Sequence, residues 1–297
     1  MKRTWTALAL AGAMVFQLAA CGASNGGGST SSAPSGEEAA LVLSDQSVTL
    51  DGSTISEGTD GAVTVSHDIV YYQAGQGEDY GAGSADDEHT AEEAGAHTVV
   101  TIRKAGTYRV SGSLSAGQLA VDLGDDAKTD PSSVVTLILD GVDITCTVAP
   151  AVIFYNVYEC DADFVAYDNE ETDNYVSSPT VDTSAAGANV ILADGSVNNI
   201  SGSYVARIYK EGTTKKLHKY DGAFYSKMSM NIGGESEGDG VLNITGENEG
   251  LDTELHLTIN GGVINIQAQD DGINVNEDGV SVVTVNGGTL QINAGLG

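Results

Sequence analysis

The sequence is short of basic residues, proline and cysteine, and the first shortage excludes a class of partner. Only 12 of its 297 residues are Lys or Arg, against 42 Asp or Glu, which gives a net charge of −30. Nucleic acid is excluded, because a protein that neutralises phosphates needs Lys and Arg. Proline is limited to 4 residues while glycine reaches 38, and no long helical pattern follows the N-terminus. This composition favours a β protein with many tight turns.

The scarcity of cysteine argues against zinc and redox chemistry. The three cysteines are Cys21, Cys146 and Cys160, and none belongs to a CxxC pair or a Cys/His cluster. Cys146 and Cys160 are fourteen residues apart, and an oxidising compartment would allow them to pair. A structural disulfide and two buried thiols remain alternatives. The five histidines show no metal spacing, and we expect His256, in LHL, to face solvent.

The first 21 residues predict export. Lys2 and Arg3 precede an apolar stretch over 5–16, and the segment ends in LAAC at Cys21. A short apolar run followed by small residues is a secretory signal, too short to span a bilayer as a mature helix. With cysteine at the cleavage point, the segment resembles the lipobox of bacterial lipoproteins, which implies lipid on Cys21. The lipid would anchor the protein to the outer face of the cell membrane.

A Gly/Ser-rich tether follows over residues 22–39 and divides the signal from the folded part. Such a flexible chain reaches roughly 20–25 Å, enough to clear the lipid headgroups. Residues 40–97 are expected to form an N-terminal β and cap region with an acidic loop, and residues 98–297 the main domain. Loss of Lys2 and Arg3 with the signal makes the net charge −32.

The C-terminal third contains a repeat. MNIGG, LTINGG and VTVNGG begin at residues 230, 257 and 283, which aligns Ile232, Ile259 and Val285. A second column is formed by GVLNI, GVINI and GTLQI, which begin at residues 240, 262 and 288 and alternate apolar with polar residues. Short alternating strands that recur every 22–27 residues predict an all-β solenoid, the parallel β-helix, with coils about 4.8 Å apart.

Acidic residues recur at one turn of these coils. The acid–glycine–apolar turns YDGA, NEGL and DDGI begin at residues 220, 248 and 270 and fall in register. Carboxylates stacked about 5 Å apart raise one another's pKa or share a cation. Ca²⁺ is the natural choice, because it accepts six to eight oxygen ligands in flexible geometry. The predicted calcium ligands are Asp221, Glu249, Asp270, Asp271, Glu277 and Asp278.

Several segments together resemble the exported carbohydrate-binding β-helix proteins of anaerobic bacteria. They are AGTYRVSGSLSAGQLAVD, TLILDGVDIT, APAVIF, NVILADGSVNNI, YDGAFYS and the NGG…INI and DDGI coils, within residues 98–297. The resemblance implies a right-handed parallel β-helix, bound calcium and affinity for pectin (polygalacturonate) or cellulose. The family continues after Ile292 with another acid–glycine–isoleucine turn. We therefore expect the chain to be truncated in its terminal coil.

Six of the 12 basic residues lie between residues 207 and 227, where tyrosines are interleaved with them. Polysaccharide lyases need an Arg or Lys that abstracts the proton beside the uronate carboxyl, and Arg207 or Lys219 would serve. The alternative is a solvated loop that offsets acidic charge. Tyr220 and Tyr225 are candidates for a sugar-stacking surface, with packing in the core or at its rim as the alternative.

These patterns predict a monomeric, surface-tethered lipoprotein that binds polysaccharide without catalysis and depends on calcium. Calcium would stabilise the acidic turns and bridge to uronate carboxylates, since an acidic polymer is otherwise repelled. A calcium-dependent polysaccharide lyase and a protein-binding adhesin or envelope scaffold are the alternatives.

Overall fold

The computed structural model describes residues 38–58, 60–168, 176 and 180–295. Strands dominate this part, with two short helices, α1 (Ala91–Gly95) and α2 (Ala162–Asp168), and a 3-10 turn (Asp125–Thr129). The all-β prediction is confirmed. The predicted signal segment, Cys21 and the tether up to residue 37 lie outside the described residues. None of the described helices has the length and apolar character needed to cross a bilayer.

The described strands form three sheets. The path of the largest is β22 (Val283–Val285), β19 (Leu257–Ile259), β16 (Met230–Gly234), β11 (Ala188–Leu192), β9 (Val135–Thr145), β12 (Val197–Gly202), β17 (Val241–Gly246), β20 (Val263–Ala268) and β23 (Thr289–Ala294). Off that path lie β1 (Glu38–Leu43), β2 (Thr49–Leu50), β3 (Ser53–Thr54) and β7 (Gly106–Leu114). The second sheet contains β21 (Ile273–Val275), β18 (Glu249–Thr253), β15 (Gly222–Ser226), β10 (Val152–Asn156), β8 (Gly117–Asp122), β6 (Thr98–Ile102) and β4 (Val63–Ser66). The third contains β14 (Lys216–Tyr220), β13 (Val205–Tyr209) and β5 (Gly81–Ala82).

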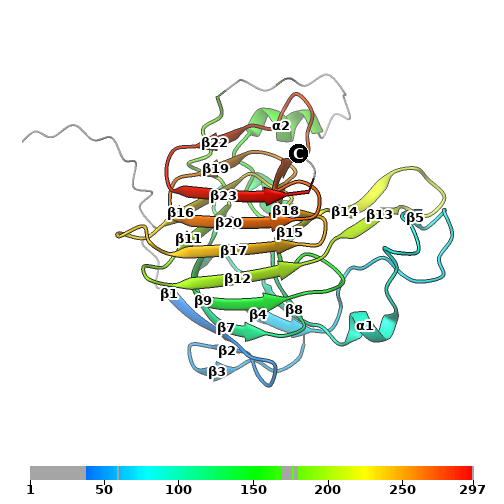
Figure 1. The fold of residues 1–297 in the computed structure, drawn as a ribbon, viewed down its shortest axis with the longest axis horizontal. Helices are drawn as coiled ribbons and strands as arrows, with labels where there is room; N and C mark the ends of the chain where they lie inside the picture. The colour runs from blue at the N-terminus through cyan, green and yellow to red at the C-terminus, as the bar shows by residue number, and fades with distance from the viewer. Residues whose placement is uncertain (1–37, 59, 169–175, 177–179, 296–297) are drawn as a thin grey trace, which may run out of the picture. The chain divides into compact units, whose positions relative to one another are not determined.

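Three columns of parallel strands organise these sheets. The first half of β9 pairs with β11 and its second half with β12, so the largest sheet divides into two columns at β9. The first column continues through β16, β19 and β22, and the second through β17, β20 and β23. The third column contains β8, β10, β15, β18 and β21. The chain visits the columns in turn, so each circuit adds one strand to each (Figure 1).

The register predicted for the first two columns is confirmed. Ile232 pairs with Ile259 and Ile259 with Val285 in the first column. In the second column, Leu242, Ile264 and Leu290 pair in succession, as do Ile244, Ile266 and Ile292. Apolar residues at these positions form the core in the inner coils, where Ile232 is fully buried and Ile244 is 1% exposed, whereas Val285 and Ile292 in the last coil are 55% and 45% exposed. Burial of stacked aliphatic side chains in register stabilises each coil on its neighbour.

Two excursions leave the columns: the first covers the outer side of the third column, and the second covers the first column and the turn that leads into it. Between β12 and β15 the chain forms the antiparallel hairpin β13–β14, which β5 extends. Between β10 and β11 it forms α2, whose first turn is capped by Asp161 Oδ1, the acceptor for Phe164 N at 3.0 Å. At the other end, β1 pairs in parallel with β7, and β4 pairs antiparallel with β6.

Cys146 and Cys160 are free thiols, so of the two alternatives the disulfide is not formed. Cys146 directly follows β9, where its backbone N donates to Ser201 O, whereas Cys160 follows β10 and donates to Glu159 Oε1. The intervening five-residue strand spans about 16 Å, beyond the roughly 7 Å that a disulfide allows between α-carbons. Burial raises the pKa of the Cys146 thiol to about 11.

Candidate functional site

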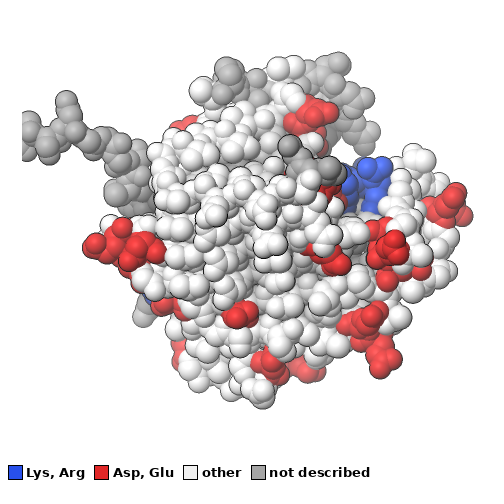
Figure 2. Space-filling model, in the orientation of Figure 1, with Lys and Arg blue, Asp and Glu red and all other residues white. Residues whose placement is uncertain are grey.

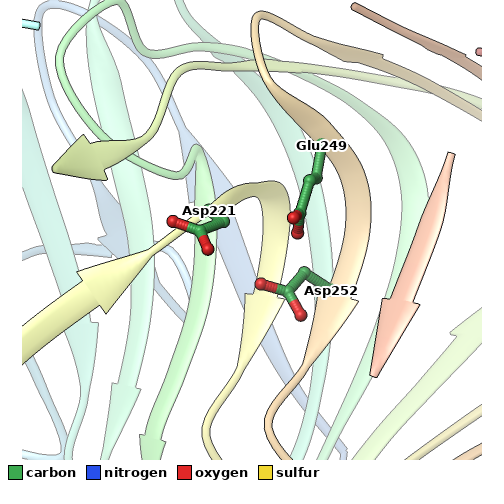
Figure 3. Close-up of side chains that lie close together, drawn as sticks. All are labelled: Asp221, Glu249 and Asp252. Atoms are coloured by element: carbon green, nitrogen blue, oxygen red, sulfur yellow. The ribbon is translucent and has the colours of Figure 1, made fainter. Parts of the chain in front are cut away.

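Three carboxylates gather beside the start of β18. Asp221 lies immediately before β15, while Glu249 is the first residue of β18 and Asp252 its fourth. One carboxylate oxygen from each lies within 4.8 Å of the others, and Figure 3 shows the three groups pointing toward one another. Asp221 and Glu249 are each 6% exposed and Asp252 is fully buried. We call these three residues the acidic triad.

The register of the third column brings the triad together, and it differs from the prediction by one residue. Gly222, rather than Asp221, pairs with Glu249, and Phe224, rather than Ala223, pairs with Leu251. The next step, Leu251 with Ile273, is as predicted. The side chains of a strand alternate between its two faces, so a shift of one residue changes which of them face the neighbouring coil.

Asp252 is the triad member that the sequence analysis missed. In the parallel ladder it pairs with Tyr225 on one side and with Asn274 on the other. It lies within a strand, in GLDTE, and not in an acid–glycine turn. The available signal was an acidic residue between Leu251 and Thr253 in the interior of a strand, because such a group is rarely buried unless it is paired or binds a metal.

Only part of the triad's hydrogen-bonding capacity is used. Asn274 Nδ2 donates to Glu249 Oε1 at 2.9 Å, and Asn276 Nδ2 donates to Asp252 Oδ1 at 2.8 Å. Lys219 Nζ lies 2.7 Å from Asp221 Oδ2. Glu249 Oε2 and Asp252 Oδ2 are buried and have no hydrogen-bond partner among the described residues. Buried polar atoms are nearly always paired, so these two oxygens point to a missing donor or cation.

The electrostatics of the triad are unfavourable for three negative charges. Burial, and then the charges of Glu249 and Asp221, raise the pKa of the Asp252 carboxyl well above its usual range. Burial, followed by the charge of Asp221, also raises the pKa of Glu249, against a smaller opposite effect of the Asn274 amide. One ammonium group, that of Lys219, faces three carboxylates. At neutral pH the triad is therefore satisfied by a bound proton or by a bound cation.

The donor set fits Ca²⁺. Three carboxylates supply hard oxygen ligands that bind in monodentate or bidentate fashion, and no soft sulfur or imidazole ligand accompanies them in the triad. Two oxygens bound to one Ca²⁺ at 2.3–2.6 Å lie at most about 5 Å apart, which agrees with the 4.8 Å limit of the triad. The two oxygens without partners belong to Glu249 and Asp252, so these residues would be the central ligands.

The other predicted ligands lie outside the triad. Asp270 and Asp271 are half-buried in the turn before β21, where Asp271 O accepts from Gly250 N at 2.9 Å. Glu277 and Asp278 are exposed in the loop between β21 and β22. Of the six predicted ligands, the structure thus brings Asp221 and Glu249 together.

Tyr220 and Tyr225 do not form a sugar-stacking surface, because their exposed fractions are 2% and 0%. Their ring centroids are 5.2 Å apart, and Tyr155 packs against Tyr220 edge to face at 5.6 Å. Tyr225 Oη donates to Glu254 Oε1 at 2.7 Å. The core-packing alternative is the correct one, because the hairpin β13–β14 covers this outer side of the third column.

Lys219 and Arg207 have different positions. Lys219 belongs to β14 and reaches the triad, whereas Arg207 is exposed on β13. Of the two residues, the structure thus brings Lys219 into contact with the acids, which the sequence pattern did not indicate. Burial lowers the pKa of Lys219, but its hydrogen bond to Asp221 and that carboxylate's charge outweigh burial, and the net pKa is raised. Lys219 is therefore an ammonium group at neutral pH.

His256 is fully buried, contrary to the expectation of a solvent-facing position. Its Nε2 lies 3.2 Å from Asp161 Oδ2, and Val282 N donates to its Nδ1 at 3.3 Å. Asp161 immediately precedes α2, so the excursion that carries this helix covers the histidine. Alternation within LHL identifies the outward face of a strand but not whether another segment lies over it.

A comparison with protein families agrees with the prediction that the chain binds carbohydrate. A family model described as "Carbohydrate-binding domain-containing protein" matches residues 96–188 and 174–297. Among solved structures, the chain is similar to a polysaccharide lyase-like protein from C. thermocellum, a gadolinium derivative. The two are 21% identical, with 87% of this chain and 83% of that chain covered and a TM-score of 0.48. No curated protein matches the chain.

Proposed function

The chain belongs to the family of carbohydrate-binding domain-containing proteins, and from this premise we propose that it is a non-catalytic polysaccharide-binding protein whose acidic triad holds Ca²⁺. The observation that carries the calcium proposal is that Glu249 Oε2 and Asp252 Oδ2 are buried and have no hydrogen-bond partner in the part of the chain that the structure describes. Export, a lipid anchor on Cys21, a position on the outer face of the cell membrane and a monomeric state complete the proposal.

The fold that we propose is a right-handed parallel β-helix. Its support is the order in which the chain visits the three columns, with parallel pairing between successive coils. Connections between parallel strands of one sheet are right-handed in about 98% of cases, which favours that hand for the coils.

Burial gives the proposed calcium a structural role. The triad is at most 6% exposed, and Lys219 at the end of the hairpin β13–β14 contacts it, so a polymer would not reach the ion without displacing the hairpin. A cation held by the triad would instead join two positions of β18 to Asp221, the residue immediately before β15. Calcium would then promote glycan binding because it keeps these coils folded in place, and not because it bridges to uronate carboxylates.

The lyase alternative is disfavoured by the state of Lys219. A general base must be unprotonated, and the contact with Asp221 keeps Lys219 in its ammonium form. Incubation of the full chain with polygalacturonate and calcium tests this point. We expect no rise in the ultraviolet absorbance that unsaturated uronate products give; a steady rise, lost in Lys219→Met, would establish a lyase.

Calorimetric titration of the full chain with CaCl₂ tests the metal site. We expect Asp252→Asn to weaken calcium binding at least about tenfold, because it removes a charged ligand while keeping the side-chain volume. Asp278→Asn is the matched control: it removes an acidic residue of the same charge from an exposed loop outside the triad, and should bind calcium like the parent protein. Equal loss in both variants would contradict the assignment of the triad.

Affinity electrophoresis tests the glycan-binding part. The full chain is run through gels that contain hydroxyethylcellulose or polygalacturonate, with calcium and with a chelator. Retardation by at least one polymer, reduced by the chelator, is expected. Unchanged mobility in every gel would refute glycan binding, and capture of a protein partner in the absence of glycans would then favour the adhesin alternative.

A further inference from the structure

Four strands of the second column, β12 to β23, form a face without charge in a protein that is otherwise rich in acids, and the neighbouring β9 carries the exposed Asp143 beside Asn199. The strands β12, β17, β20 and β23 read VNNISG, VLNITG, VINIQA and TLQINA, and contain no Asp, Glu, Lys, Arg or His. Figure 2 shows this face as a continuous white area with acidic residues only around it. Since 42 residues of the chain are acidic, a surface of four adjacent strands without one is a distinct feature.

The face is also regular. β12–β17, β17–β20 and β20–β23 each pair over six successive residues without a register shift. Its outward residues therefore lie in three rows that run across the strands. The rows are Val197, Val241, Val263 and Thr289; Asn199, Asn243, Asn265 and Gln291; and Ser201, Thr245, Gln267 and Asn293. We call these twelve residues the ladder face.

The middle row is a ladder of hydrogen-bonded amides. Asn243 Nδ2 donates to Asn199 Oδ1 at 2.9 Å, and Asn265 Nδ2 donates to Asn243 Oδ1 at 2.9 Å. A carboxamide has two N–H donors and two acceptor lone pairs, so Asn243 keeps one donor and one acceptor for a ligand. The ladder fixes the orientation of these groups before any ligand arrives, which lowers the entropy cost of binding.

The chemistry of the ladder face matches an uncharged polysaccharide. Oriented amides donate to and accept from hydroxyl groups, while the adjacent row, where Val197 is 53% exposed, offers an apolar strip for the C–H faces of sugar rings. An acidic polymer or nucleic acid would find no cation here to offset the chain's negative charge. Repeats of the same side chain about 4.8 Å apart suit a ligand that is itself a repeating chain.

We propose that the ladder face binds a neutral glycan chain, separately from the acidic triad and without a bridging cation. This inference rests on the proposed glycan-binding function and deepens it by naming the surface and an uncharged substrate class. The triad lies in the third column and the ladder face in the second. Calcium would therefore affect the ladder face only by stabilising the coils that the two columns share.

Affinity electrophoresis of the full chain in hydroxyethylcellulose, with calcium present, tests the proposal. We expect the double variant Asn243→Ala/Asn265→Ala to bind at least about tenfold more weakly than the parent, because two oriented amides are lost. Thr245→Arg is a second variant, since this exposed side chain makes no hydrogen bond with the described residues and its replacement projects from the face. It should weaken binding to a similar extent.

Asn286→Ala is the matched control, because it removes an equivalent amide hydrogen bond, 2.9 Å long to Asn260 Oδ1, away from the ladder face. Its retention should equal that of the parent, and calcium titration of all variants confirms that they are folded. Parent-like retention of both ladder-face variants would overturn this inference alone, whereas a parent that binds no glycan would overturn the proposed function as well. Sedimentation that shows a dimer, lost in Thr245→Arg while glycan retention persists, would assign the face to a second copy and also overturn the inference.

Discussion

At the scale of single residues, the triad is held in a state that costs stability without a cation. Asp252 is fully buried, and one of its two oxygens has no described partner. Its neighbour Glu249 also has one buried oxygen without a described partner, and the pKa values of the Glu249 and Asp252 carboxyls are both raised. A neutral side chain of the same shape at position 252 would remove the repulsion between the carboxylates, whereas a bound cation would be attracted by all three of them.

The first prediction concerns the sign of the Asp252→Asn effect on stability. In chelator at neutral pH, we expect this variant to unfold with a free energy about 1–3 kcal/mol higher than the parent, because it removes a buried carboxyl that must be either ionised without a counter-charge or protonated at a cost. In saturating calcium the order should reverse, since only the parent gains binding energy. Urea unfolding followed by circular dichroism, with and without calcium, measures both. A variant less stable than the parent in chelator would contradict this account.

The second prediction is a pH dependence that belongs to the same residues. Because the folded-state pKa values of Asp252 and Glu249 are raised, the calcium-free fold is favoured when they are protonated. Their contribution is therefore fully present below the usual carboxyl pKa of about 4, and is lost as pH rises through the raised values. The unfolding free energy of the parent minus that of Asp252→Asn, measured in chelator, should fall as pH rises. A flat or rising difference would show that the carboxyls are not desolvated in solution.

At the scale of strands and turns, glycine permits the close approach of the coils at the triad. A Cβ on Gly222 would lie 2.6 Å from the Cβ of Asp252, in the adjacent strand. Neither atom belongs to a flexible side-chain end, so one of the two strands would have to move. The spacing between β15 and β18, and with it the geometry of the triad, depends on this residue.

The third prediction follows from that contact. Gly222→Ala should lower the unfolding free energy by about 1–3 kcal/mol and weaken calcium binding, because overpacking displaces Asp252. Gly95→Ala, in α1, is the control, since a Cβ there meets nothing within 4 Å. Thermal unfolding and calcium titration of both variants provide the comparison. Parent-like calcium binding by Gly222→Ala would show that the triad tolerates a wider strand spacing.

The same elements show how far the sequence allowed prediction. The register of the first two columns was predictable, because NGG turns and alternating apolar residues recur with equal spacing in each coil. The third column was predicted one residue out of register at Asp221. There the chain enters β15 from the hairpin β13–β14 and not from a short turn. Aligning Asp221-Gly222 with Glu249-Gly250 therefore gave the wrong register, because the two dipeptides follow different connections. The path of a hairpin is decided by long-range packing, and a local sequence pattern carries no information about such packing.

Burial of outward residues was the other point that pattern could not decide. Alternation predicted that His256 faces solvent and left Tyr225 open between a sugar-stacking surface and packing in the core or at its rim, but the segment around Asp161 and α2 covers the histidine and the hairpin covers the tyrosine. By contrast, the amide positions Asn243 and Asn265 were predicted to face away from the core, and neither is buried by the residues that the structure describes. Whether an outward residue becomes buried or functional therefore depends on where the two excursions fold back.

At the scale of the whole molecule, the distribution of charge determines which glycans can approach. A net charge of −30 produces a field that repels polyuronates over about 10 Å in 0.1 M salt. The proposed ladder face lies in a region without charged strands, and the proposed calcium is buried too deeply to serve as a counter-ion for a polymer. An uncharged chain would approach without either obstacle.

The fourth prediction is that the two polymers respond differently to ionic strength. Because neither partner in the contact is charged, retention by hydroxyethylcellulose should change less than about twofold between roughly 50 and 500 mM NaCl. Polygalacturonate should be bound more weakly at low salt, and any affinity for it should rise with salt as the repulsion is screened. Affinity electrophoresis across this series measures both slopes. Strong binding of polygalacturonate that weakens with added salt would contradict this prediction, because it would require an attractive basic surface. Arg207 and its basic neighbours on β13 and β14 would then be the first residues to replace. Such a result would place an acidic polymer on the hairpin instead of a neutral polymer on the ladder face.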